Sequence, residues 1–178
     1  MPIKSIIKSL LSFFIIGTFI FLSSCTQEKE PVEVYIMRHT EKTVWDNPDT
    51  TAVYDPDLSS VGRERAQKLV EVFNDRDIAA IYSTEFKRNM GTVLPLAEKR
   101  GIEIREYEAH DWGDMLEEIG VEFRGKSVLI CGHRNNIFNL ISAMNGTPPQ
   151  DSLAEYEYDK IFHLKWSENN TEVRTITF

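Results

Sequence analysis

Three short apolar runs, rich in β-branched residues, constrain the fold of this chain more than any other feature. They lie at residues 32–37, 78–82 and 127–131, and each has the length of a strand. None of them alternates cleanly between apolar and polar residues, which indicates strands buried on both faces of a sheet. Stretches with helical spacing of apolar residues lie between the runs. We therefore predict an α/β fold in three layers, with a mostly parallel central sheet flanked by helices.

The spacing of the other segments completes this prediction. A loop is expected over residues 46–60, followed by a helix that Ser59 or Ser60 caps. Apolar spacing, capping residues and alternation predict further elements as follows: helices over residues 85–100 (ending at Gly101), 112–121 and 135–144, a strand over 102–106, and a closing antiparallel pair at 162–166 and 172–178.

Cationic and imidazole side chains follow the predicted buried strands. Arg38 and His39 end the first strand, His133 ends the third, and Arg88 follows the second within one helical turn. Taken singly, these residues are ordinary, because most Arg-His pairs are solvated and most histidines after a strand are structural. Ligands of parallel sheets, however, bind at the carboxyl ends of the strands. We therefore expect the two arginines and two histidines to converge.

Such a group of side chains suits phosphate chemistry. Guanidinium groups match the oxygens of a phosphate, and a neutral imidazole can attack phosphorus. Neighbouring cations favour the neutral form of a histidine. The pattern contains neither an HExxH motif nor a cysteine–histidine cluster of the zinc type, so it predicts no metal site.

The motifs that carry these residues also resemble those of the histidine phosphatase superfamily, which has the phosphoglycerate mutase-like fold. The resembling segments are MRHTEK, LSSVGRERAQKL, YSTEFKRNMGTVLPLAEKRG, SVLICGHRNNI and EYEYDKIFHL, in the order of the family. The resemblance implies that His39 is the phosphorylated nucleophile and that Arg38, Arg88 and His133 form the phosphate pocket. It implies no metal and no other cofactor.

Three residues depart from the family pattern. Thr40 replaces the usual Gly or Ala after the nucleophile and is expected to narrow the pocket. Arg134 and Asn136 replace the Ser and Thr common after the second histidine. Arg134 either joins the phosphate site and favours a more anionic substrate, or is a solvated side chain.

A general acid is needed to protonate the leaving oxygen. The segment at residues 106–118 offers Glu108, Asp111 and Asp114, and Glu41 is a further candidate near His39. Of these we choose Asp111 as the predicted acid. The alternative is that each is an ordinary surface carboxylate. His110 and His163 are predicted to be structural or surface residues.

The first 24 residues read as a secretory signal: Lys4 and Lys8, an apolar middle, and small residues before Cys25. An uncleaved transmembrane anchor is the alternative, but the apolar run is short for the ~20 residues that a span needs. The segment LSSC resembles the lipobox of bacterial lipoproteins, which implies cleavage before Cys25 and a lipid on its sulfur. We expect a signal at residues 1–24, a lipidated cysteine and polar tether at 25–31, and one domain at 32–178.

Composition excludes some classes of function. The net charge is −8, and loss of Lys4 and Lys8 with the signal would make it more negative, so nucleic acid is a poor partner. With Cys25 lipidated, Cys131 has no partner for an internal disulfide and is expected to be a buried apolar residue.

The predicted function is a phosphomonoester hydrolase with a phosphohistidine intermediate on His39, anchored in the cell envelope and facing the periplasm or the exterior. Sugar phosphates, nucleotides and phosphorylated glycolipids all remain open as substrates, and no pattern specifies an oligomeric state. A non-catalytic, anchored phosphate-binding module is the main alternative. A phosphoglycerate mutase is a weaker one, because its substrates are cytoplasmic and this chain lacks long insertions.

Overall fold

The structure is a computed structural model, and it describes residues 30–44, 55–168 and 170–178. The predicted signal, Cys25 and most of the predicted tether lie outside the described residues. No helix among those described is both long and apolar enough to cross a membrane.

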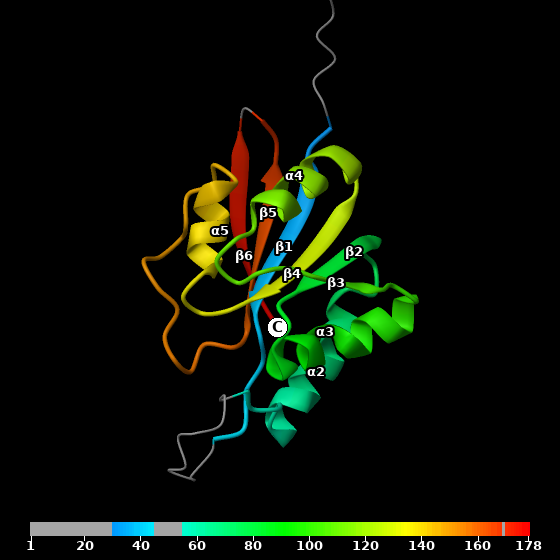
Figure 1. The fold of residues 1–178 in the computed structure, drawn as a ribbon, viewed down its shortest axis with the longest axis vertical. Helices are drawn as coiled ribbons and strands as arrows, with labels where there is room; N and C mark the ends of the chain where they lie inside the picture. The colour runs from blue at the N-terminus through cyan, green and yellow to red at the C-terminus, as the bar shows by residue number, and fades with distance from the viewer. Residues whose placement is uncertain (1–29, 45–54, 169) are drawn as a thin grey trace, which may run out of the picture.

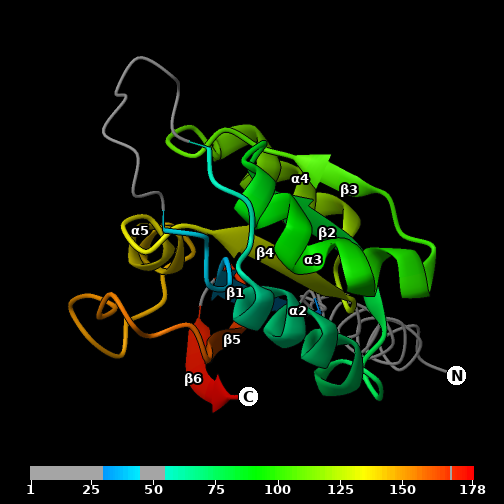
Figure 2. The same cartoon turned by 90° about the horizontal axis from the view of Figure 1, so that it is seen from below.

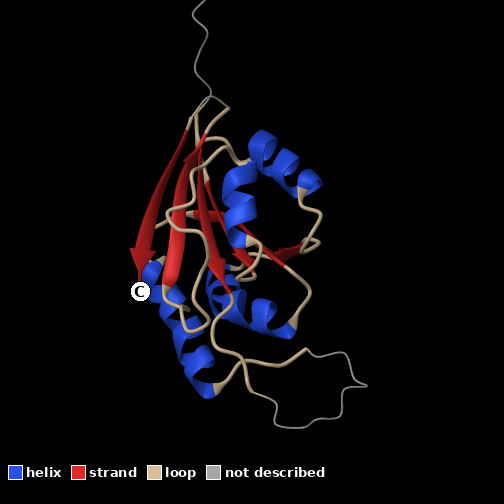
Figure 3. Cartoon of the chain, turned by 90° about the vertical axis from the view of Figure 1, so that its left-hand side faces the viewer, coloured by secondary structure: helices blue, strands red, loops and turns tan. Residues whose placement is uncertain are grey.

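Six strands of the described residues form one sheet (Figures 1 and 3). Their order across the sheet is β3 (Ile104–Glu106), β2 (Ile78–Ser83), β4 (Ser127–Gly132), β1 (Val32–Arg38), β5 (Lys160–Trp166) and β6 (Thr171–Thr177). The first four strands in this order pair in parallel. Strands β5 and β6 complete the sheet with antiparallel pairing, as predicted for the chain's last two strands. Strand β1 therefore lies between the parallel and the antiparallel parts of the sheet.

Helices cover both faces of the sheet, which confirms the predicted three layers. The helices are α2 (Ser60–Val72), α3 (Lys87–Arg100), α4 (Gly113–Glu122) and α5 (Ile137–Ala143). Because successive side chains of a strand point to opposite faces, Val34 and Ile36 of β1 pack in the core beneath α4 and α5. Tyr35 and Met37 pack in the second core, which α2 and α3 cover. Figure 2 shows α2 and α3 side by side.

Local chemistry explains where the helices of the second core begin and end. Ser59 caps α2, because its Oγ accepts the N–H of Gly62 at 3.1 Å. Helix α3 ends at Gly101, which adopts the left-handed conformation (φ 65°) that glycine tolerates best. Helix α3 begins at Lys87 rather than residue 85, because Phe86 is extended and serves as the N-cap.

Helix α2 also comes unusually close to the loop that follows β1. A Cβ atom on Gly62 would lie 2.1 Å from the backbone oxygen of Glu41. Glycine at this position therefore lets the helix touch the backbone immediately after the predicted nucleophile.

Cys131 occupies the centre of the sheet and is fully buried, as predicted. Burial raises the pKa of its thiol to about 12, so it is an inert packing residue.

Candidate active site

The carboxyl ends of β1 and β4 meet at one edge of the sheet. Arg38 pairs with Gly132 in the strand register, and the N–H of His39 donates to the oxygen of Gly132 at 3.1 Å. The rings of His39 and His133 are 5.9 Å apart between centroids. Arg88, from the first turn of α3, reaches His133 from the β2 side of this edge. The structure thus brings together the two histidines and Arg88 as predicted.

The backbone oxygen of the next residue holds His39 in one tautomer. Its Nδ1 lies 2.7 Å from the oxygen of Thr40, and a carbonyl oxygen can only accept a hydrogen bond. Nδ1 therefore carries the proton and donates it. Nε2 is left with its lone pair, which is the form that a nucleophile requires.

The surroundings of His39 keep its ring neutral. The residue is only 5% exposed, and this burial is the largest cause that lowers its pKa from 6.5 to about 3. The charges of Arg38 and Arg88 lower the pKa further. At neutral pH the Nε2 lone pair is therefore available.

His133 has the opposite tautomer. Nη2 of Arg88 lies 3.5 Å from Nδ1 of His133, and a guanidinium can only donate. Nε2 therefore carries the proton and donates to Oγ1 of Thr84 at 3.0 Å. Burial, followed by the charge of Arg88, lowers the pKa of His133 to about 4. An arriving phosphate dianion would offset the charge of Arg88 and favour protonation of this ring.

The guanidinium of Arg38 is clamped by the segment that precedes β5. Its Nη1 donates to the oxygens of Glu155 at 2.7 Å, Ala154 at 3.3 Å and Glu157 at 3.4 Å. Nη2 donates to the hydroxyl of Tyr158 at 3.0 Å, and the guanidinium carbon lies 3.9 Å from the centre of that ring. The ring of Tyr158 in turn lies 6.1 Å from that of His39. Arg38 is thus fixed beside His39.

Each arginine has a buried N–H group that makes no hydrogen bond within the described part of the chain. Nε of Arg38 makes no hydrogen bond among the described residues, and neither does Nη1 of Arg88, which lies 3.5 Å from Oδ1 of Asp55. Buried donors are rarely left unpaired in folded proteins. Two such donors beside a neutral histidine are suited to bind an anion.

Thr40 does not narrow the site as expected, because its hydroxyl points to the helices. Oγ1 donates to the oxygen of Gly62 at 2.9 Å and lies 3.2 Å from Oγ1 of Thr92. The N–H of Thr40 also donates to Thr92 Oγ1, at 2.9 Å. Thr40 therefore anchors the end of β1 to α2 and α3.

Asn136 is likewise a structural residue. It is buried, its Oδ1 accepts the N–H of His133 at 2.8 Å, and its Nδ2 donates to the oxygen of Ala109 at 2.9 Å. It ties the turn that carries His133 to the segment that carries the candidate acids. Arg134 is exposed, and its charge lowers the pKa of Arg38 after burial does, so it lies on the Arg38 side of the site.

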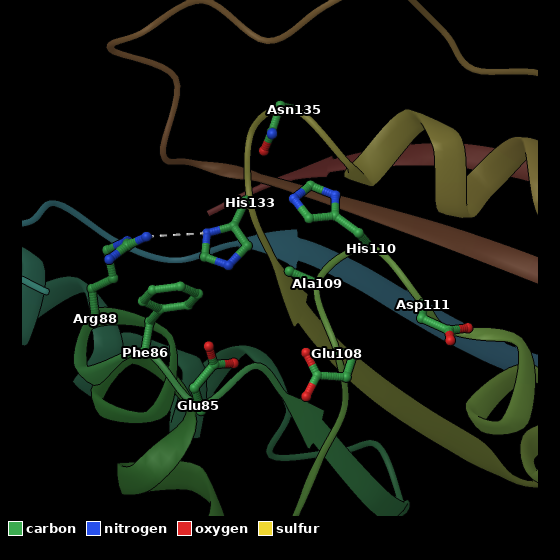
Figure 4. A pocket seen from close by; sticks show the side chains of 9 residues that line it. All are labelled: Glu85, Phe86, Arg88, Glu108, Ala109, His110, Asp111, His133 and Asn135. Atoms are coloured by element: carbon green, nitrogen blue, oxygen red, sulfur yellow. Dashed lines mark hydrogen bonds between the residues drawn. The ribbon is translucent and has the colours of Figure 1, made fainter. Parts of the chain in front are cut away.

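A pocket of about 440 Å³ opens beside His133 and Arg88 (Figure 4). Its walls come from the start of α3, from the segment before α4 and from the turn after β4. The lining residues are Glu85, Phe86, Arg88, Glu108, Ala109, His110, Asp111, His133 and Asn135.

The pocket favours a different acid from the predicted one. Asp111 lines it, but its carboxylate points away from His133, whereas that of Glu108 points across the pocket toward Glu85 (Figure 4). Glu41 is bound by Arg65, whose Nη2 lies 2.8 Å from its Oε1. Burial alone would raise the pKa of Glu41, but these hydrogen bonds hold it below its usual value. Asp114 lies in the first turn of α4 and outside the pocket lining.

Sequence reasoning gave no site role to Tyr158, Glu85, Phe86 or His110. Tyr158 follows no strand end, and its position became visible only through the pairing of β5 with β1. His110 is exposed, as expected for a surface residue, and it also lines the pocket, where its charge contributes to the lowered pKa of His133. His163, in contrast, is structural: it contacts Glu33 and stacks on Tyr35 at 4.5 Å.

In the part of the chain that the structure describes, no group of three or more His, Cys, Asp or Glu side chains is arranged to hold a metal ion.

Comparison with known proteins relates this site to phosphatases. The family model of the histidine phosphatase superfamily (branch 1) matches residues 34–111. Phosphoserine phosphatase 1 of Hydrogenobacter thermophilus is 33% identical in an alignment of 95 residues that covers 49% of this chain and 44% of that protein. The chain thus matches less than half the length of this curated relative.

Solved structures of low sequence identity share the fold. The protein histidine phosphatase SixA, complexed with tungstate, has a TM-score of 0.63 at 17% identity, over 82% of this chain and 96% of that one. YhfR of Bacillus stearothermophilus has a TM-score of 0.62 at 18% identity, over 80% and 95%. A mycobacterial glucosyl-3-phosphoglycerate phosphatase has a TM-score of 0.54 at 17% identity, over 82% and 97%.

Proposed function

We propose that this chain belongs to the histidine phosphatase superfamily and hydrolyses phosphate monoesters through a phosphohistidine on His39. The family match over residues 34–111 and the shared fold support this proposal. The substrate is a small phosphorylated molecule. The residues that act are His39, His133, Arg38 and Arg88, with a carboxylate of the neighbouring pocket as the acid.

The observation that carries this proposal is an available lone pair beside two buried N–H groups that make no hydrogen bond among the described residues. His39 presents an unprotonated Nε2, and the two groups are Nε of Arg38 and Nη1 of Arg88, the latter 3.5 Å from Oδ1 of Asp55. Phosphate oxygens would satisfy both donors and hold the phosphorus near the lone pair.

The reaction then has two steps. Nε2 of His39 attacks phosphorus, the bond from phosphorus to the ester oxygen breaks, and the leaving oxygen takes a proton from the acid. Water then attacks the phosphorus of the phosphohistidine, and its proton passes to the same carboxylate. The bond from phosphorus to Nε2 breaks, the electron pair returns to Nε2, and inorganic phosphate leaves. The arginines stabilise the transferring phosphoryl group in both steps. No step uses a metal.

We propose Glu108 rather than Asp111 as the acid, because its carboxylate points into the pocket that adjoins His133 (Figure 4). A leaving group needs protonation most when its own pKa is high, so loss of the acid should act selectively on poor leaving groups.

A comparison of two variants tests this assignment. Glu108→Gln should lower kcat far more on an alkyl phosphate than on para-nitrophenyl phosphate, and Asp111→Asn should affect both substrates alike. The reverse pattern would restore Asp111 as the acid, and equal losses in both variants would exclude both residues.

We also propose that the domain acts in the cell envelope, where a lipid attached to Cys25 anchors it to the membrane. The support is the order of features in residues 1–31: a charged start, an apolar run, LSSC and a polar tether. A phosphoglycerate mutase would be poorly placed there.

The decisive experiment is hydrolysis of para-nitrophenyl phosphate in the presence of a chelator, with the domain from Thr26 and its His39→Ala and His39→Asn variants. We expect metal-independent activity that both variants abolish, and a ³²P label on histidine in the parent only.

A folded parent that binds phosphate without hydrolysing any ester would instead support the phosphate-binding module. Circular dichroism of each variant checks that lost activity does not reflect lost folding.

A further inference from the structure

The pocket next to the proposed phosphate site carries a charge opposite to that of the phosphate site. Three of its lining residues are carboxylates, namely Glu85, Glu108 and Asp111, and all three are exposed to solvent within it. They come from two separate segments, the turn before α3 and the segment before α4. Figure 4 shows the carboxylates of Glu85 and Glu108 directed toward one another below Phe86 and His133.

The cationic groups gather on the other side. Arg88 lines the boundary of the pocket and contacts His133, while Arg38 lies beyond it, under the segment before β5. Arg134 does not line the pocket, and its charge is one of the causes that lower the pKa of Arg38.

This division fixes how a substrate would lie. A phosphate held by Arg38 and Arg88 would have its organic part next to this pocket, because the pocket shares Arg88 and His133 with the phosphate site. That pocket repels a carboxylate or a second phosphate and attracts a cation. The ring of Phe86, which also lines it, offers an apolar surface for a short methylene chain.

We propose that the preferred substrate is the phosphate monoester of a small alcohol that carries an ammonium group, with Glu85 as the residue that selects for this charge. The inference rests on the proposed hydrolysis at His39 and adds the substrate class. Glu108 adds to the attraction but also serves as the proposed acid, so Glu85 is the residue that can be tested separately.

The test compares three two-carbon esters that differ mainly in charge: phosphoethanolamine, 2-hydroxyethyl phosphate and phosphoglycolate. We expect kcat/KM to fall in that order, by about tenfold at each step, because exposed charge pairs each contribute modestly and the pocket combines several. The preference should shrink at roughly 1 M salt, where the Debye length is ~3 Å.

Two variants with the same change in net charge provide the control. Glu85→Gln should reduce the ratio of kcat/KM for phosphoethanolamine over 2-hydroxyethyl phosphate about threefold. Glu103→Gln should leave this ratio unchanged, because Glu103 is exposed and precedes β3, at the opposite end of that strand from the pocket. Comparing ratios between proteins removes the different intrinsic reactivities of the esters.

The outcomes separate this inference from the proposed function. Absence of His39-dependent hydrolysis of para-nitrophenyl phosphate would overturn the function and the inference together. Hydrolysis of that ester with equal kcat/KM for the three probes, or with phosphoglycolate preferred, would keep the function and overturn the inference. An equal change of the ratio in Glu85→Gln and Glu103→Gln would remove Glu85 as the selecting residue.

Discussion

At the scale of single residues, the neutral form of His39 links the active site to stability. In the folded protein, burial lowers the pKa of His39 to about 3 and that of His133 to about 4. An unfolded chain binds these protons near pH 6.5, so protons favour unfolding below that pH. The free energy of unfolding therefore carries no penalty from these two histidines above pH 6.5. It decreases as the pH falls from 6.5 toward their pKa values in the folded protein.

This gives a measurable difference between pH 7 and pH 5. We expect the free energy of unfolding to fall by about 2 kcal/mol for each of the two histidines over this interval. In His39→Gln, whose side chain stays uncharged, the fall should be smaller by about 2 kcal/mol. Denaturant unfolding of both proteins at both pH values tests this, and an equal fall in the two proteins would contradict it.

A second prediction concerns Tyr158, which positions Arg38 through its hydroxyl and its ring. Tyr158→Phe keeps the ring and loses the hydrogen bond, so inhibition by inorganic phosphate should weaken about fivefold. Tyr158→Ala loses the ring contact as well as the hydrogen bond, so inhibition by inorganic phosphate should weaken by roughly tenfold or more. KM should rise by a larger factor than kcat falls. An unchanged inhibition constant in both variants would show that Arg38 holds its place without Tyr158.

The residues that sequence could predict are those at strand ends. Arg38, His39 and His133 follow apolar runs, and the topology of a parallel sheet brings such ends together. The direction of side chains in the connecting segments follows no such rule. Glu108 and Asp111 lie in one tight turn, where the N–H of Asp111 donates to the oxygen of Glu108 at 3.2 Å. The geometry of that turn decides which of the two carboxylates faces the pocket. The spacing of apolar residues in the sequence does not predict it. The same holds for the hydroxyl of Thr40.

At the scale of elements, the close approach of α2 to the backbone after β1 predicts a sharp response to one methyl group. In Gly62→Ala the new Cβ would lie 2.1 Å from the oxygen of Glu41, so the helix or the loop must shift. We expect a loss of about 1–3 kcal/mol in unfolding free energy and a lower kcat, because Thr40 and His39 precede that loop.

Gly91→Ala is the matched control for this prediction. Its Cβ would meet only the end of the Leu58 side chain, at 3.3 Å, and alanine favours a helix over glycine by up to ~1 kcal/mol. Thermal unfolding and para-nitrophenyl phosphate kinetics should show a small effect. Equal losses in the two variants would mean that helix packing in general, and not the contact with Glu41, limits both.

The predicted helices and strands agreed with the structure in type and order, and the starts of α3, α5, β3 and β5 each differ from the prediction by two residues. Most of the loop predicted over residues 46–60 lies outside the described residues. Helix α5 begins at Ile137, two residues later than predicted, because His133 and Asn136 first form a hydrogen-bonded turn. Helix α3 starts late for a similar reason at Phe86. Both late helix starts lie beside the candidate site. There the backbone conformation positions His133 and Arg88 instead of continuing the helix.

At the scale of the whole molecule, the proposed attachment through Cys25 predicts how the full chain partitions. The lipidated chain should enter the detergent phase of a phase separation and take up labelled palmitate. Cys25→Ser should take up no label and remain with the precursor length, because cleavage before this residue depends on its sulfur. Labelling that persists in the variant would overturn the lipoprotein proposal without touching the enzymatic one.

Strand β1 lies between the two parts of the sheet, and this has a consequence for the order in which the protein becomes competent. The carbonyl groups that hold Arg38 are 116–119 residues away along the chain. Contacts so distant in sequence form late, because a long loop must first close. A nascent chain in which both histidines and both arginines have been synthesised therefore still lacks the carbonyl groups that position Arg38 to bind phosphate. If the proposed function holds, activity should therefore appear only after the segment before β5 has docked on Arg38.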